Sequence, residues 1–401
     1  MLRVTLAHAR AATSCRALAI TLPFALAPSL IFCGSTQPAE STVVSAAAMK
    51  SAPAITVDRE LGESVWPGEA EATRAIADRL EKSIEERYPK AKRPARRDAH
   101  PKAHGCVRAS FKVADGLPAN LAQGVFVPGA SYKAWIRFSN GSSDPARPDV
   151  KGDARGMAIK LTGVPGVKLL PAEREAETQD FIMINHPVFF IDDPQDYLRL
   201  IQRGSSSSSL VKLTAPFALG LKGALIARTI SSKKIENPLY TRYWSTVPYR
   251  LGDDAHKQAV KFSARPCAVH ANNKIPSDPG PAYLRQAMAA TLAADEACFD
   301  FLVQTRRSPS MKVEDSKTEW KESEAPFIKV ATITIPKQTF DSEAQMAFCE
   351  NLSFTPWHSL PEHRPLGAVN RVRRTVYESV SKRRHDLNQA PRKEPTGDER
   401  F

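Results

Sequence analysis

Four segments of alternating or continuous apolar residues follow one another within residues 100–190, and they constrain the fold more than any other feature of the chain. In Val107–Val113, apolar residues at the odd positions alternate with Arg, Ser and Lys. Tyr132–Phe138 and Met157–Leu161 repeat this pattern, and the short apolar run Phe181–Ile184 follows. A period of two predicts strands with one buried face. Because turn residues rather than helical patterns separate them, these strands predict an antiparallel sheet or barrel.

Helical patterns flank this sheet. Glu69–Tyr88 has apolar residues at four-residue spacing, which predicts an amphipathic helix that ends at Pro89. The composition also turns helical over Pro281–Gln304, and Phe327–Ile335 returns to a strand pattern. The fold class that we predict is therefore α+β, an antiparallel β-barrel with flanking helices and one more helix near the C-terminus.

The composition is that of an ordinary soluble globular protein, with 42% hydrophobic and 25% charged residues in a chain of 401. The formal net charge of +13 allows anionic partners. The positive residues are spread over three runs, Lys90–Arg97, Arg371–Arg374 and Lys382–Arg384, rather than gathered in one patch with interleaved aromatic residues. We therefore expect no nucleic-acid partner. The sequence also lacks a dinucleotide-binding loop, a P-loop and a nucleophile elbow.

The first 33 residues differ in kind from the rest. Three arginines precede an apolar run, Ala17–Cys33, which two prolines interrupt. Positive residues before an apolar stretch predict an export signal, and the prolines argue against a stable membrane span. We therefore expect an exported protein, periplasmic or anchored to a membrane through this N-terminus. Residues 34–66 are expected to form a Ser/Ala-rich tether.

Residues 67–388 are predicted to form the folded domain, and the polar residues 389–401 a disordered tail. Six cysteines are present, and none belongs to a C-x-x-C pair. Removal of the N-terminus would leave four widely spaced ones: Cys106, Cys267, Cys298 and Cys349. They could form disulfides in an exported protein. Because a core of this size needs no such bonds, we favour the alternative that they are small buried side chains.

The basic stretch Asn370–His385 carries the most distinctive chemistry. If it is helical, Arg373, Tyr377 and Arg384 lie within roughly 40° of one another on one face, at about 100° per residue. A guanidinium beside a phenol favours the ionised phenolate, because a nearby positive charge stabilises the charged form. A phenolate is a hard anionic ligand, and tyrosine is one of the few side chains that serve as an axial ligand of haem iron. The plainer alternative is a basic amphipathic helix with an ordinary packing tyrosine.

This stretch resembles the proximal helix of haem catalases, whose pattern is R-x-x-x-Y-x6-R. Arg373, Tyr377 and Arg384 occupy its three fixed positions, and Pro365–Gly367 resembles the P-x-G that precedes the helix. Upstream, Arg97–His100 matches the family's R-x-x-H, in which the histidine faces the haem and the arginine reaches a propionate.

Three further blocks resemble the same family in the same order. Trp135–Asn140 resembles the V-R-F-S block, which implies that Arg137 also serves a propionate. Asp153–Lys160 resembles D-x-R-G-x-A-x-K, a block of the core. Asp180–Pro194 resembles D-L-V-x-N-N-x-P-x-F-F-x-x-D-P, but the family's distal asparagine falls on Ile184. Either the neighbouring Asn185 takes its role or the amide that orients peroxide is lacking.

From these ordered blocks the chain is identified as a member of the haem catalase superfamily, and it resembles the small catalase-related branch. The resemblance implies haem, with haem b as the expected type, and Tyr377 as its iron ligand beside Arg373. It also implies that Arg97, Arg137 and Arg384 neutralise the propionates. His100, with His104 as the competing candidate, and Asn185 are the implied catalytic residues.

The function that the resemblance implies is haem-dependent decomposition of hydrogen peroxide or organic hydroperoxides in the response to oxidative stress. Two alternatives stay open. One is a fatty-acid hydroperoxide isomerase or dehydratase similar to allene oxide synthase, and the other is a non-catalytic haem-binding protein. Assembly into a homo-oligomer also stays open.

Overall fold

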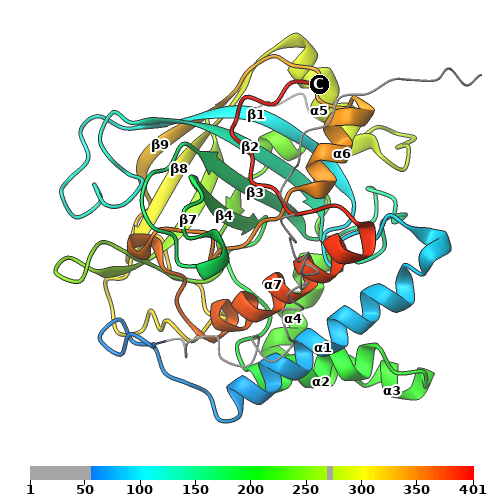
Figure 1. Cartoon of the computed structure of the whole chain (residues 1–401). Helices are drawn as coiled ribbons and strands as arrows, with labels where there is room; N and C mark the ends of the chain where they lie inside the picture. Colours follow the sequence, from blue (N-terminus) through cyan, green and yellow to red (C-terminus); the bar gives the residue numbers. More distant parts are fainter. Residues whose placement is uncertain (1–55, 269–273) are drawn as a thin grey trace, which may run out of the picture. The chain divides into compact units, whose positions relative to one another are not determined.

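Antiparallel strands form the centre of the fold in the computed structural model, which describes residues 56–268 and 274–401 (Figure 1). The strand order is β5-β4-β3-β2-β1-β9-β8-β7-β6. Because β5 pairs with both β4 and β7, eight of these strands close into a barrel, and β6 adds to β7 outside the ring. The predicted α+β class with an antiparallel barrel is confirmed. The export signal predicted for residues 1–33 lies outside the described residues.

The strands and helices have the following bounds. The strands are β1 (Ala103–Val113), β2 (Ser131–Asn140), β3 (Arg155–Thr162), β4 (Thr178–Ile184), β5 (Tyr243–Trp244), β6 (Tyr249–Leu251), β7 (Gln258–Pro266), β8 (Ala297–Thr305) and β9 (Ile328–Ile335). The α-helices are α1 (Glu69–Arg87), α2 (Pro194–Gly204), α3 (Ser209–Leu213), α4 (Gly220–Ser232), α5 (Tyr283–Ala294), α6 (Glu343–Asn351) and α7 (Ala368–Asn388).

The barrel interior holds the main hydrophobic core. In β1 the apolar residues at the odd positions from Val107 to Val113 are buried, and the polar residues between them are exposed, as the alternation predicts. Phe111, Phe181 and Phe301 contact one another inside the barrel. In β2 the outward-facing side chains are buried as well, because α6 covers Trp135 and Arg137 lies in the wall of a cavity.

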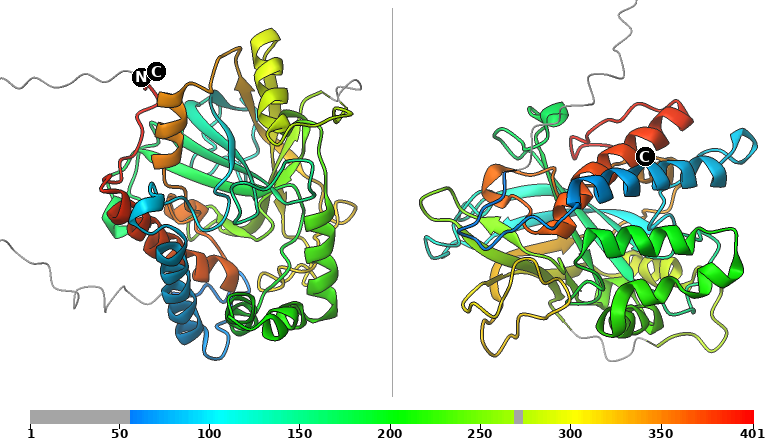
Figure 2. Two further views of the ribbon diagram at one scale, coloured as in Figure 1. Left: turned by 90° about the vertical axis from the view of Figure 1, so that its right-hand side faces the viewer. Right: turned by 90° about the horizontal axis from the view of Figure 1, so that it is seen from below.

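A layer of helices lies against one end of the barrel (Figures 1 and 2). α1 packs along α7, and Ile76 and Ala77 of α1 meet Val372 and Val376 of α7 in one apolar cluster. α2 contacts both of these helices, and α4 follows it through α3 and a short 3-10 helix, η4 (Ala215–Leu219). The sequence patterns predicted α1 and the C-terminal helix but none of α2–α4.

One predicted helix is wrong in its second half. Pro281–Gln304 divides into α5 and β8, with Asp295 at the end of the helix. The Ala-rich first half favours a helix. In Ala297–Thr305, aromatic and branched residues pair with β7 on one side and β9 on the other, and this pairing overrides the helical tendency.

Both ends of the predicted domain differ from the expectation. The predicted tether ends in residues that contact the fold, since Glu63 pairs with Arg364 at 2.6 Å. Residues 389–401, predicted to be disordered, have no helix or strand but lie against the barrel. There Trp135 Nε1 donates to Glu399 Oε2 at 2.8 Å, and the rings of Trp135 and Phe401 are 6.0 Å apart. Charged and aromatic partners on the barrel thus hold this polar segment.

The four cysteines of the described residues form two disulfides rather than free buried thiols. Cys106–Cys349 joins β1 to α6, and Cys267–Cys298 joins the region after β7 to β8. The Cα atoms are 5.6 Å and 5.5 Å apart, within the usual range for a disulfide. The preference for free thiols was wrong because the packing of α6 on β1 and the pairing of β7 with β8, which bring these positions together, are not visible in their spacing.

Candidate active site

A cavity of about 490 Å³ lies between the barrel and the helical layer. Its wall combines the segment before β1 with parts of β2, β3, β4, α2, α4 and α7. Its volume is in the range of small-molecule and cofactor sites, about 300–1,000 Å³. Six of the seven predicted site residues line it: Arg97, His100, Arg137, Arg373, Tyr377 and Arg384.

The predicted helical face of Asn370–His385 is confirmed, because Arg373, Tyr377 and Arg384 of α7 all line this cavity. The Tyr377 side chain is half-buried, and its hydroxyl has no hydrogen-bond partner among residues 56–268 and 274–401. The Arg373 guanidinium lies 5.3 Å from the ring centre of Phe189 and donates to Asn370 Oδ1 at 3.3 Å.

The start of α7 is fixed by a glycine and a buried ion network. Gly367 has φ +84°, and a Cβ there would lie 2.9 Å from the Val313 carbonyl oxygen, so only glycine fits. Arg371 pairs with Glu63, Glu69 and Glu314 at 2.9, 2.6 and 3.0 Å. These contacts hold the helix axis, and with it the direction of Tyr377.

His100 lines the same cavity. Its Nδ1 lies 3.0 Å from Ser139 Oγ, and its carbonyl oxygen accepts from Arg137 Nη2 at 2.8 Å. Burial lowers the pKa of His100, and the positive charges of Arg137, Arg373 and Arg97 lower it further, to about 3. The imidazole is therefore neutral near pH 7. Since Ser139 occupies Nδ1, Nε2 is the nitrogen left to accept a proton.

The competing candidate, His104, lies elsewhere. It is fully buried on β1, with Nε2 2.8 Å from Asn140 Oδ1 and Nδ1 3.7 Å from Asp149 Oδ2. It does not line the cavity. Of the two histidines, only His100 faces the space that Tyr377 also lines.

The structure differs from the prediction at Asn185. Its Oδ1 accepts the backbone N–H of Arg155 at 2.8 Å, and its carbonyl oxygen accepts from Lys233 Nζ at 2.8 Å. The side chain thus extends the pairing of β3 with β4 and does not line the cavity, whereas Ile184 does. The alternative stated from the sequence, that the distal amide is lacking, fits this arrangement.

Three guanidiniums meet at one edge of the cavity around Glu350, two of them at its carboxylate and one at its carbonyl oxygen. Arg97 Nη1 lies 3.0 Å from Glu350 Oε1, and Arg137 Nη2 lies 3.9 Å from Glu350 Oε2. Arg384 Nη1 donates to the Glu350 carbonyl oxygen at 2.6 Å. Burial, with the charge of Arg97 added, lowers the pKa of Arg137 and of Arg384 to about 9. The positive charges outnumber their partners here, so this edge is suited to an anion.

These observations fit a haem. Two propionates would balance the excess of positive charge, and the buried Arg137 Nε, which has no hydrogen bond within the described part of the chain, is a free donor at that edge. The unpartnered Tyr377 oxygen offers an anionic ligand to the iron. Glu350, which orients the arginines, was missed by sequence reasoning because it belongs to none of the blocks.

The comparisons with known proteins find similarity to catalases. The family model described as Catalase matches residues 78–210. A catalase-related peroxidase from Mycolicibacterium paratuberculosis is 26% identical over 227 residues, which are 54% of this chain and 67% of the relative. Over these residues the chain is similar to catalases and to a catalase-related peroxidase.

Solved catalases share the fold at low identity. A fungal catalase superposes with a TM-score of 0.61 at 17% identity, covering 78% of this chain and 64% of that one. Catalase A from Saccharomyces cerevisiae gives 0.57 at 18%, with 78% and 66% covered, and a bacterial catalase 0.56 at 14%, with 78% and 63%. The chain thus spans less than two thirds of the length of each of these catalases.

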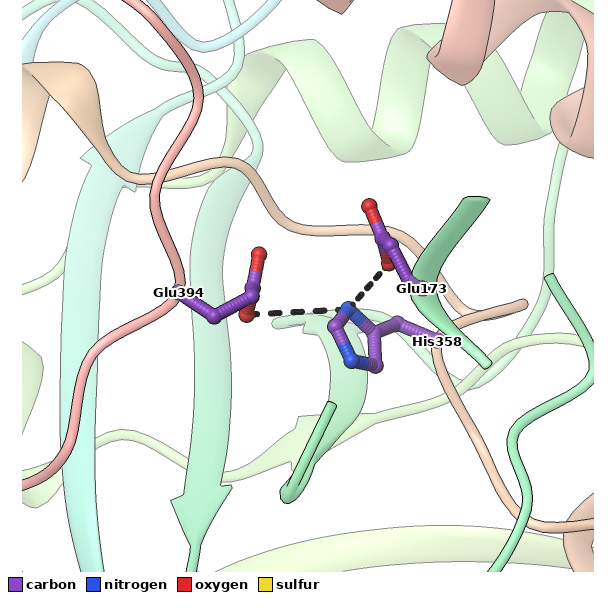
Figure 3. A group of neighbouring side chains, drawn as sticks. All are labelled: Glu173, His358 and Glu394. Carbon is purple, nitrogen blue, oxygen red and sulfur yellow. Dashed lines mark ion pairs between the residues drawn. The ribbon is translucent and has the colours of Figure 1, made fainter. Parts of the chain in front are cut away.

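A second cluster of metal-ligand side chains lies outside the catalase-like cavity (Figure 3). His358 Nδ1 lies 2.6 Å from Glu173 Oε2 and 3.7 Å from Glu394 Oε2, and the three ligand atoms are within 4.8 Å of one another. Both carboxylates already have cationic partners, since Lys160 Nζ lies 2.7 Å from Glu394 and Arg392 pairs with both. We therefore interpret the cluster as an ionic network that holds residues 389–401 against the barrel.

Proposed function

We propose that this protein is a haem-dependent oxidoreductase that decomposes peroxides. The observation that carries the proposal is that His100 and Tyr377 line one cavity whose edge holds three arginines around Glu350. Tyr377 would hold the iron, and Arg97, Arg137 and Arg384 would hold the propionates. Haem b is the type that we expect. When bound, the haem supplies an iron that exchanges electrons with the peroxide.

The protein's own residues manage the protons. The neutral imidazole of His100 accepts the proton of the incoming peroxide at Nε2 and returns it to the departing oxygen, which then leaves as water. Ser139 fixes the ring through Nδ1, so that Nε2 keeps one direction. Arg137 holds the backbone at His100 through its carbonyl oxygen.

The test is the absorption spectrum of the purified full chain, followed by oxygen evolution from hydrogen peroxide. We expect a haem spectrum that Tyr377→Phe alters or abolishes. His100→Ala should keep the haem and lower turnover on the order of 100-fold or more. His256→Ala, at an exposed histidine, is the control. Unchanged turnover in His100→Ala would reject the assignment of the base, and an unchanged spectrum in Tyr377→Phe would reject the iron ligand.

A second candidate function is the isomerisation or dehydration of a fatty-acid hydroperoxide. Ile184, an apolar side chain, lines the cavity at the position where the resemblance predicts a distal amide. An apolar wall favours an organic hydroperoxide over hydrogen peroxide. Product analysis with a fatty-acid hydroperoxide separates this candidate from oxygen evolution. Bound haem with neither activity would indicate a haem-binding protein without turnover.

Export remains part of the proposal. The two disulfides support an oxidising compartment, because such bonds are rare where thiols are kept reduced. A periplasmic or membrane-anchored location and a role in the response to oxidative stress are thus proposed together.

A further inference from the structure

The exposed apolar side chains of this protein are concentrated in one short segment. Ten large hydrophobic side chains are exposed in the described residues, and six of them fall between residues 210 and 225. We call these six the apolar surface: Leu210, Val211, Leu213, Phe217, Leu221 and Leu225. Leu213, Phe217 and Leu221 are 76%, 78% and 81% exposed, respectively. Such a patch on a protein is characteristic of an interaction site.

The apolar surface belongs to three short elements that follow α2: α3, η4 and α4 (Figures 1 and 2). The stretch Ser209–Ser232 is apolar enough to enter a membrane, with a mean hydropathy of 1.5 and only 22% of it buried. This stretch is not built to cross a membrane. Its longest helix has 13 residues, about 20 Å at 1.5 Å per residue, against a hydrocarbon core of about 30 Å.

The opposite face of α4 is turned toward the barrel. Ala227 and Ile230 of this helix line the cavity, and a Cβ at Gly223 would lie 2.5 Å from the Phe190 carbonyl oxygen. The helix is therefore held close against the loop before α2. It can present its outer residues to a bilayer only while it lies on the membrane surface.

The charges around the apolar surface have one sign. Between Leu198 and Ile235 the sequence contains seven Lys and Arg residues and no Asp or Glu. Lys212, Arg228 and Lys234 are exposed and have no ion pair within the described residues. Apolar side chains flanked by unpaired cations match the boundary of an anionic bilayer, where the former enter the acyl region and the latter meet lipid head groups.

A second copy of the chain fits this surface less well. In a two-fold contact the same cations would face one another, and the chain carries a net charge of +13. We propose that the apolar surface docks the protein on an anionic membrane. We further propose, resting on the proposed peroxide decomposition, that the cavity receives its substrate from that membrane as a lipid hydroperoxide.

The cavity and the apolar surface are two faces of one helical layer. Pro194 and Tyr197 of α2 and Ala227 and Ile230 of α4 line the cavity from within, while the apolar surface lies outward on α3, η4 and α4. Docking would thus bring the cavity wall close to the lipid, so an acyl chain could enter without crossing water.

Docking is tested on the full chain by co-sedimentation with phosphatidylglycerol–phosphatidylcholine vesicles and with pure phosphatidylcholine vesicles. Phe217→Ser with Leu221→Ser should lower partitioning onto the anionic vesicles on the order of 10–100-fold, because two large side chains no longer enter the bilayer. The matched control is Val127→Ser with Val167→Ser, at two exposed valines elsewhere. Its partitioning should equal that of the wild type. Hydrogen exchange should show protection of residues 210–225 on anionic vesicles, a local readout that the N-terminus does not affect.

Wild-type partitioning in the Phe217, Leu221 variant would overturn docking, as would unprotected amides in this segment. Loss of a dimer in the same variant during size-exclusion chromatography would instead identify the surface as a contact between copies. For the substrate, the variant should keep wild-type turnover of soluble hydrogen peroxide and lose turnover of a phospholipid hydroperoxide held in vesicles. Equal loss on both substrates would overturn the substrate claim. A wild type without turnover on either would reject the proposed function, while docking is decided by sedimentation and hydrogen exchange.

Discussion

A glycine decides how closely the imidazole of His100 can approach the barrel wall. Gly156 on β3 pairs with Ser139 on β2. A Cβ on Gly156 would lie 2.7 Å from His100 Nδ1 and 2.8 Å from Ser139 Oγ, closer than atoms in proteins pack. The contact between these two side chains, which fixes the imidazole, therefore depends on the absence of a side chain at 156.

Gly156→Ala is accordingly expected to displace the His100 ring while leaving the haem side of α7 untouched. Turnover of peroxide should fall on the order of 10–100-fold, because small misplacements of a catalytic group are costly. The haem spectrum should persist. Gly116→Ala is the matched control, since a Cβ there meets no atom within 4 Å. Steady-state oxygen evolution from both variants checks the prediction, and equal rates would contradict it.

A fixed spacing singled out Arg97, His100 and Tyr377, which the fold brings to one cavity. The direction of the Asn185 side chain was not predictable, because on a strand a shift of one position turns a side chain to the other face. No sequence pattern indicated a role for Glu350. Its partners come from segments some 250 residues apart along the chain, and only the folded chain brings Arg97 and Glu350 within 3.0 Å.

At the scale of elements, periodicity predicted the strands of the first barrel half and the face of α7 that lines the cavity. It did not predict the anchors of that helix, since the carboxylates around Arg371 come from three separate places in the chain. It also misassigned β8, whose pairing on both sides decides its conformation. The helices α3 and α4 were missed because their outward side chains are apolar, so the contrast between an inner and an outer face is weak. The helix α2 was missed although its apolar side chains pack in one cluster.

The disulfide Cys106–Cys349 ties α6 to β1 next to the arginine edge of the cavity. Cys349 is followed by Glu350, and the Cys349 carbonyl oxygen accepts from Arg97 Nη2 at 3.4 Å. Serine at both positions is expected to lower the free energy of unfolding by about 2–5 kcal/mol and to loosen the three arginines. The haem dissociation rate should therefore rise.

Cys267→Ser with Cys298→Ser provides the comparison, because neither residue lines the cavity. That variant should lose stability as well, but its haem dissociation rate should remain that of the wild type. Haem transfer to an acceptor protein measures the rates. The same haem dissociation rate in both variants would show that the disulfide next to Glu350 does not support the cavity.

At the scale of the whole molecule, the positively charged residues lie in three separate places. Buried arginines surround the cavity edge, Lys160 and Arg392 hold residues 389–401, and unpaired cations flank the apolar surface. The net charge of +13 is thus divided among the cavity edge, closure of the fold and, as we propose, membrane contact.

Buried neutral histidines make the whole fold sensitive to acid. His104 and His363 lie outside the cavity, and burial is the first cause that lowers the pKa of each to about 3, whereas an unfolded histidine titrates near 6.5. Between these values the unfolded chain binds protons that the folded chain does not. The free energy of unfolding therefore falls as the pH falls from about 6.5 toward 3, with a slope of up to about 1.4 kcal/mol per pH unit for each histidine.

Denaturant unfolding at a series of pH values between 6.5 and 4 measures this slope. His363→Asn, which can keep an acceptor for the Val125 N–H that His363 Nε2 now binds at 2.9 Å, should reduce the slope by about one proton. Gly116→Ala should leave it unchanged, because it alters no ionisable group and a Cβ there meets no atom within 4 Å. A slope that His363→Asn does not alter would mean that this imidazole is protonated inside the fold. The buried ring against Phe126 and Phe181 argues against that charge, since aromatic side chains do not replace its solvation.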